Sequence, residues 1–84
     1  MNIGFENRVV AERVTGILAN IGNPAKQLRE LAQQERRLFS AQAGRRTRSL
    51  VIMDSNQVFA SAIAPETLMA RLKEARKQEK EASQ

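Results

Sequence analysis

The run Leu50-Val51-Ile52-Met53 constrains the fold of this chain more than any other stretch, because it is apolar at every position. A strand with one face in water alternates apolar and polar residues, whereas a continuously apolar strand is covered on both faces. We therefore expect residues 50–53 to form a central strand with structure packed on each side. A turn at residues 54–57 then leads into a second apolar strand, residues 58–63, which completes a hairpin.

Three arginines directly precede the central strand, in the sequence Gly44-Arg45-Arg46-Thr47-Arg48. Since a central strand fixes where its preceding loop lies, these side chains should share one side of the molecule. Arginine carries a permanent charge and a planar fork of donors that matches phosphate oxygens, and Gly44 lets the backbone turn where a side chain would clash. The run is therefore a candidate anion site, although a solvated basic turn would have the same composition.

The other segments predict a small, single α+β domain with short antiparallel strands and two helices. Further short strands are expected at residues 3–5, 9–10, 14–18 and 38–39. Asn23 as N-cap and Pro24 as first helical residue begin one helix, and Pro65 with Glu66 begins the other. The domain would comprise residues 1–76, and residues 77–84 would be a frayed charged tail because they lack an apolar stripe.

A chain of 84 residues has only a small core of its own, because it buries roughly 60% of the surface that its unfolded form exposes. It has neither cysteine nor histidine, so disulfides and the usual zinc sites cannot stabilise it. Self-association is the remaining route. The expected subunit contacts are apolar or small residues of the early strands and of the second hairpin strand, namely Val9, Val10, Val14, Ala60 and Ala62.

The residue inventory argues against an enzyme and against a membrane protein. Without His or Cys, a nucleophile and its base have no obvious candidates, and the acidic residues form no pair suited to acid–base work. We expect no metal, no cofactor and no small-molecule substrate. No run approaches the ~20 apolar residues of a membrane span, and the N-terminus lacks a signal pattern. The expected location is the cytoplasm.

The net charge of +5 arises entirely in residues 1–53, where arginine outnumbers lysine eight to one. Arginine favours fixed contacts with phosphate or carboxylate over mere solubility. Proteins that bind single strands usually stack bases on aromatic side chains, but the three phenylalanines here lie in apolar runs and are expected in the core. Duplex DNA is therefore the expected partner. The alternative is a structural module whose basic face binds RNA or an acidic protein.

The candidate DNA contacts fall into two groups. Arg45, Arg46 and Arg48 are the principal candidates, and the exposed face of the first helix offers secondary ones at Arg29, Arg36 and Arg37. Arg13 stands at the entrance of the strand 14–18, where it would either pair with Glu12 or Glu6 or contact a ligand.

Several of these segments together resemble the RemA family of bacterial regulators. The resemblance is carried by Asn2-Ile3-Gly4-Phe5, the run from Gly44 to Arg48, Asp54-Ser55 and Pro65-Glu66-Thr67, and it covers nearly the whole chain apart from the tail. It implies a LytTR-like domain, assembled into a homo-oligomeric ring that binds DNA along its surface and activates biofilm-matrix genes. It also implies that Arg45, Arg46 and Arg48 touch DNA, with Arg13 near the same surface.

The sequence matches this family at Pro24 and departs from it at two turns. Glu6 stands where the family usually has glycine, and Ala43 where it has tyrosine. These departures bear on ring size and target promoters more than on the arginine site.

Overall fold

A computed structural model describes the backbone of residues 1–82 and the side chains of residues 1–78. The elements in chain order are β1 (Asn2–Gly4), β2 (Asn7–Arg8), the short 3-10 helix η1 (Ala11–Arg13), β3 (Val14–Ala19), α1 (Gly22–Gln34), β4 (Leu38–Ser40), β5 (Ser49–Met53), β6 (Val58–Ser61) and α2 (Pro65–Ala82). Strands β1 and β2 form a hairpin, and the remaining four form a sheet in the order β3-β5-β6-β4. The expected small α+β domain with two helices is confirmed.

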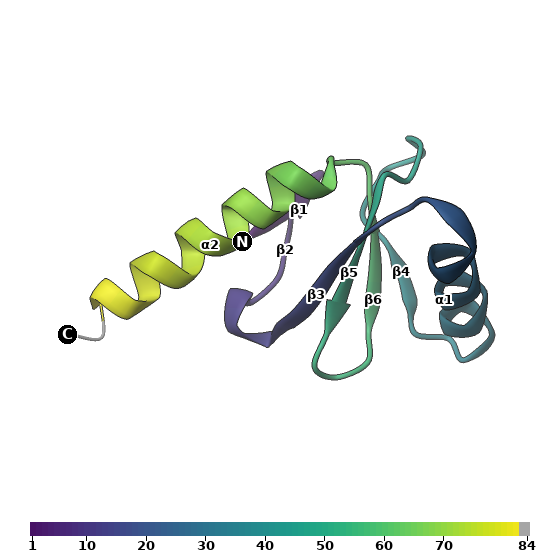
Figure 1. The fold of residues 1–84 in the computed structure, drawn as a ribbon, viewed down its shortest axis with the longest axis horizontal. Coiled ribbons are helices and arrows are strands. Elements are labelled where there is room, and N and C mark those ends of the chain that lie inside the picture. Colours follow the sequence, from purple (N-terminus) through teal and green to yellow (C-terminus); the bar gives the residue numbers. More distant parts are fainter. Residues whose placement is uncertain (83–84) are drawn as a thin grey trace.

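Strand β5 lies inside the sheet, as its apolar sequence predicted. It pairs antiparallel with β3 on one side and with β6 on the other. Leu50 and Val51 are completely buried but belong to two separate cores, one on each face of the sheet. Figure 1 shows these two coverings: α1 lies on one face, and α2 with the β1–β2 hairpin lies on the other.

The core beneath α1 depends on small residues. Ala25 and Ala32 of the helix pack with Leu50 of β5 and with Val58 and Ala60 of β6. Alanines on both surfaces let the helix approach the sheet closely. Val58 and Ala60 of β6 are therefore covered by α1 within the chain, although Ala60 was expected at a subunit contact.

The opposite core joins the two ends of the chain. Ile3 of β1, Val14 of β3 and Val51 of β5 pack with Leu68 and Leu72 of α2. Arg76 adds a side-chain contact, because its Nη2 donates to the Val14 carbonyl oxygen at 2.8 Å. Residues 65–76 of α2 are therefore fastened to the sheet by apolar and polar contacts.

The sheet is mixed, although only antiparallel strands were expected. Strand β4 runs parallel to β6, with Phe39 opposite Phe59. The path of the chain explains this direction. Helix α1 ends near the end of the sheet where the β5–β6 turn lies, so β4 must run in the same direction as β6 to reach the start of β5. The brief strand expected at residues 38–39 is confirmed.

Several element boundaries differ from the prediction, most by one or two residues, and three of the differences matter most. The second strand lies at Asn7–Arg8 rather than at residues 9–10. Helix α1 begins at Gly22, so Asn23 is its second residue and not its N-cap. Helix α2 continues to Ala82, so residues 77–82 are helical rather than frayed, and residues 83–84 lie outside the described part. Strong helix formers and the bond from Gln78 Nε2 to Glu74 Oε1 at 3.3 Å support this extension.

Helix α2 gives the molecule its elongated outline, with extents of 42 × 23 × 22 Å. Its C-terminal turns extend away from the sheet (Figure 1). Within residues 1–82, no helix combines the length and the apolar content that crossing a bilayer requires.

Candidate nucleic-acid interface

The arginine loop, which we define as residues 44–48, projects from the end of the sheet where β5 begins and β6 ends (Figure 1). Its base is held by backbone hydrogen bonds. The Arg48 amide donates to the Ser61 carbonyl oxygen at 2.8 Å, and the Asn20 amide donates to the Arg48 carbonyl oxygen at 2.9 Å. The Asn20 side chain also donates to the Thr47 carbonyl oxygen at 3.0 Å. The loop is therefore attached to both neighbouring strands.

A tight turn leads into the arginine loop. The Arg45 amide donates to the Gln42 carbonyl oxygen at 3.0 Å, and the two residues between them, Ala43 and Gly44, have φ angles of +50° and +79°. Glycine adopts this left-handed conformation without strain, whereas alanine does not. No atom lies within 4 Å of where a Gly44 Cβ would stand, so the turn needs glycine there for its backbone angle and not for space.

The three guanidinium groups of the loop have no acidic partner among the described side chains. Arg45, Arg46 and Arg48 are exposed, and among the residues whose side chains the structure describes, the ion pairs are Arg13 with Asp54 and Arg37 with Glu35. The loop therefore presents three uncompensated positive charges to solvent. Such charges attract a polyanion and lose little when they leave water for phosphate oxygens.

A pair of buried serines, which the sequence reasoning missed, anchors the base of the loop. Ser49 and Ser61 lie opposite each other in β5 and β6 and are fully buried. Ser49 Oγ donates to the Ile63 carbonyl oxygen and Ser61 Oγ donates to the Ile3 carbonyl oxygen, each at 2.6 Å. Ser61 Oγ also accepts from the Ile63 amide at 3.1 Å. The serine pair thus joins the loop, the β1–β2 hairpin and the segment that enters α2.

A recess of about 460 Å³ lies beside the loop. Its lining combines the loop with the ends of β3 and the start of α2: Ala19, Asn20, Ile21, Arg46, Thr47, Arg48, Pro65 and Glu66. The recess holds two of the three loop arginines and one carboxylate. Its size and charge suit a sugar-phosphate group of a nucleic-acid backbone.

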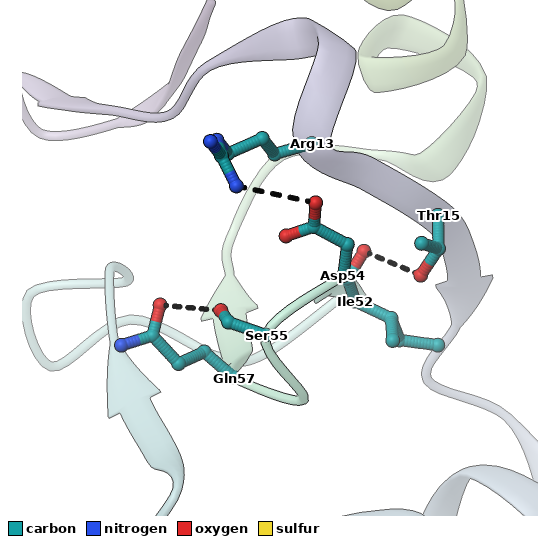
Figure 2. Close-up of polar contacts among 6 residues, drawn as sticks. All are labelled: Arg13, Thr15, Ile52, Asp54, Ser55 and Gln57. Atoms are coloured by element: carbon teal, nitrogen blue, oxygen red, sulfur yellow. Dashed lines mark hydrogen bonds and ion pairs between the residues drawn. The ribbon is translucent and has the colours of Figure 1, made fainter.

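Arg13 lies at the other end of β5 from the arginine loop. Its Nη1 is 3.4 Å from Asp54 Oδ2, with both side chains largely exposed (Figure 2). Its partner is therefore Asp54, whereas the sequence suggested Glu12 or Glu6. The five residues of β5 span about 17 Å at ~3.4 Å per residue. Within one chain, then, Arg13 does not share a surface with Arg48.

The secondary arginine candidates also lie away from the loop. Arg37 is engaged within the chain, since its Nη2 lies 2.7 Å from Glu35 Oε1 and its Nη1 donates to the Asn56 carbonyl oxygen at 2.8 Å. Arg36 has a φ of +58° in the turn that ends α1. Arg29 is half-buried on α1, and its Nε has no hydrogen-bond partner among the described atoms. These arginines do not extend the surface of the loop.

The five residues expected at subunit contacts divide into two groups. Val9, Val14 and Ala60 are buried in the cores of the single chain, so their side chains cannot meet a partner. Val10 is 55% exposed and Ala62 is partly exposed. Val14 and Ala60 are buried because β3 directs Val14 toward α2, and β6 directs Ala60 toward α1.

Phe5 is another correction, because the sequence placed all three phenylalanines in the core. Phe39 and Phe59 do stack on each other, with ring centroids 5.4 Å apart, although Phe39 remains 40% exposed. Phe5 is 69% exposed at the tip of the β1–β2 hairpin. The apolar run around Phe5 therefore led to the wrong prediction that this aromatic side chain is buried.

Comparison with known proteins adds the family. The model of the RemA-like family, described as extracellular matrix regulatory protein A-like, matches residues 1–72. A protein of Nitratidesulfovibrio vulgaris is 51% identical over 71 residues, covering 84% of this chain and 81% of its own length. One of Petrotoga mobilis is 46% identical over 71 residues, with coverages of 84% and 75%. Each bears the name "Putative regulatory protein" and neither name is that of an enzyme. The match extends from β1 to Leu72 in α2, across both cores and the arginine loop, and the chain therefore belongs to the RemA-like family of regulatory proteins.

Proposed function

We propose that this chain is a transcriptional regulator that binds duplex DNA through the arginine loop, displayed repeatedly by a homo-oligomeric ring. The observation that carries the proposal is the loop itself. It presents three exposed guanidinium groups with no carboxylate at ion-pair distance in the described part of the chain, on a base held by the serine pair. A fixed base reduces the entropy lost on binding. The regulatory names of the relatives agree with this role.

Duplex DNA is favoured over a single strand by the surroundings of the loop. Two of the three phenylalanines stack on each other over the sheet and offer no row of platforms along which successive bases could lie. Guanidinium groups on a projecting loop suit phosphates along a groove. A LytTR-like mode of DNA binding and the activation of matrix-type genes are the corresponding family-level proposals.

Assembly into a ring would supply the affinity that one chain lacks. Three arginines per chain make a small site, but a ring turns each contact after the first into an intramolecular event, with a gain of about 10² or more. Bending DNA around the ring costs on the order of several kcal/mol, which several loops together can offset. Arg13, distant from the loop in one chain, could approach the loop of a neighbouring copy. Val10 and Ala62 are the accessible candidates for subunit contacts.

The test of this function compares ligands at one moderate salt concentration. Fluorescence anisotropy with a DNA duplex of about four helical turns (~10 base pairs each), a matching RNA and an acidic peptide should give tight binding to DNA alone. Tight binding to RNA or to the peptide, without binding to DNA, would establish the alternative of an RNA- or protein-binding module.

Assembly is tested by Val10→Glu in native mass spectrometry, because Val10 is exposed and lines no recess beside the arginine loop. This variant should dissociate the oligomer and weaken DNA binding together. A folded monomer with undiminished DNA affinity would contradict the avidity argument.

A further inference from the structure

The tip of the β1–β2 hairpin carries an exposed aromatic side chain next to the arginine loop. Phe5 and Arg45 both line a second recess, of about 290 Å³, which shares no lining residue with the first. The remaining lining comes from β1, the β4–β5 connection, the residues after β6 and α2: Asn2, Gly4, Ala41, Gln42, Ala62, Ile63 and Arg71. An aromatic ring and two arginines thus share one hollow with both polar and apolar neighbours.

The backbone at this tip is strained. Phe5 and Glu6 form a two-residue loop between the paired residues Gly4 and Asn7, and their φ angles are +49° and +65°. Hairpin loops with positive φ at both positions favour Asn-Gly, and a bulky residue in this region is an outlier. Surrounding contacts impose the conformation, because Asn7 Nδ2 donates to the Gly4 carbonyl oxygen at 3.1 Å and the serine pair holds β1.

This strain directs an aromatic residue outward, which does nothing for the stability of the chain. Burying Phe5 would contribute to a small core, whereas the structure leaves it in water at a position where asparagine would be less strained. A strained backbone conformation that brings no gain in stability is typical of binding sites.

The charge of the recess indicates what Phe5 contacts. Arg71 Nη1 donates to the Asn2 carbonyl oxygen at 3.1 Å, which holds the guanidinium over β1. Among the residues whose side chains the structure describes, two guanidinium groups and no carboxylate line the hollow. A second copy of this basic chain would offer little complementary charge there, whereas a nucleic acid offers phosphates for the arginines and a base for the ring.

We propose that Phe5 is a specificity-determining residue that contacts DNA bases while Arg45 and Arg71 hold the adjacent phosphates. The proposal rests on the proposed function and deepens it, because phosphate contacts fix position but do not read sequence. Phe5 contributes an uncharged contact, either with a base edge in a groove or as a wedge inserted between two base steps of the duplex. The neighbouring Glu6 carboxylate opposes phosphate binding, so Glu6→Gly should increase both affinity and stability.

The decisive variant is Phe5→Asn, which separates binding from folding. Asparagine tolerates positive φ, so the melting temperature should rise, while affinity for the DNA duplex should fall about tenfold, the lower end of what one base–aromatic contact contributes. The slope of log K against log salt should stay unchanged, because no charge is lost. Phe5→Tyr should bind as the wild type does. Arg71→Ala, by contrast, should flatten the slope by about one unit.

Three results would overturn the proposal. A Phe5→Asn variant that binds the duplex within about twofold of wild type would show that the ring makes no base contact, because losing such a contact should weaken binding about tenfold. Dissociation of the oligomer by Phe5→Asn in native mass spectrometry would show that a second copy covers Phe5. Failure of the wild type to bind the duplex would remove this proposal together with the DNA-binding function, whereas unchanged binding by Phe5→Asn alone leaves that function standing.

Discussion

Ser61 joins three segments of the chain, and removing its hydroxyl should destabilise the fold strongly. Its side chain is fully buried. Its Oγ donates to the Ile3 carbonyl oxygen at 2.6 Å and accepts from the Ile63 amide at 3.1 Å. Ser61→Ala would leave the Ile3 carbonyl oxygen and the Ile63 amide without these partners.

The magnitude follows from these two bonds. An unsatisfied buried carbonyl costs roughly 1–3 kcal/mol, and the second bond contributes roughly 0.5–1.5 kcal/mol, so the expected loss is about 2–4 kcal/mol in the free energy of unfolding. A chain of this length has a total stability on the order of 4–12 kcal/mol. For this size, 1 kcal/mol shifts the melting temperature by roughly 4–8 °C, which makes the expected decrease at least about 8 °C.

Thermal unfolding followed by circular dichroism measures this loss, with all variants at one protein concentration because oligomerisation affects the melting temperature. Ser40→Ala is the matched control, since Ser40 is exposed and its Oγ donates to the Gln42 side chain rather than to a buried backbone group. The control should melt within about 4 °C of wild type, as surface substitutions usually do. If Ser61→Ala melts as close to wild type as the control does, the anchoring role of the serine pair is wrong.

Three further predictions concern the ends of the helices. Arg36→Gly should stabilise the chain by about 0.5–1 kcal/mol in urea unfolding, because Arg36 has a φ of +58° at the end of α1; Arg29→Gly, within the same helix, should destabilise it by a similar amount. Arg37→Ala should cost about 1–2 kcal/mol through its lost bonds to Glu35 and Asn56, yet leave DNA affinity unchanged in anisotropy. Truncation after Arg76 should leave that affinity within about a factor of two, since the tail has balanced charge; a large loss would show that the tail packs on a neighbour.

The parts of the fold that the sequence predicted are those set by local pattern. Continuous apolarity identified β5 as central because burial on both faces leaves no polar position. The turn after Asp54 and the prolines at positions 24 and 65 located the hairpin and both helices for equally local reasons. The direction of β4 could not be predicted, because the path of the chain around α1 decides it.

The site was predictable as a loop but not as an assembly of side chains. Gly44 and the three arginines that follow it identified the loop, because a loop that directly precedes a central strand must lie at the end of the sheet where that strand begins. The role of Ser61 was hidden, because a serine in an apolar strand has no periodic signature until its partners Ile3 and Ile63 are known. Phe5 was misplaced because a strained turn, and not hydropathy, determines its exposure.

The central claim, that the arginine loop holds DNA phosphates, is tested most directly by the salt dependence of duplex binding. Each phosphate contact contributes about 0.9 to the slope of log K against log salt. Replacing Arg45, Arg46 and Arg48 with alanine should therefore flatten the slope by about 2.7 for each loop engaged. The matched control removes three charges from α1 and the turn that follows it, by replacing Lys26, Arg29 and Arg36 with alanine, and its slope should remain close to wild type. An unchanged slope for the loop variant, with a flattened slope for the α1 variant, would place the DNA site on the helix and contradict the account.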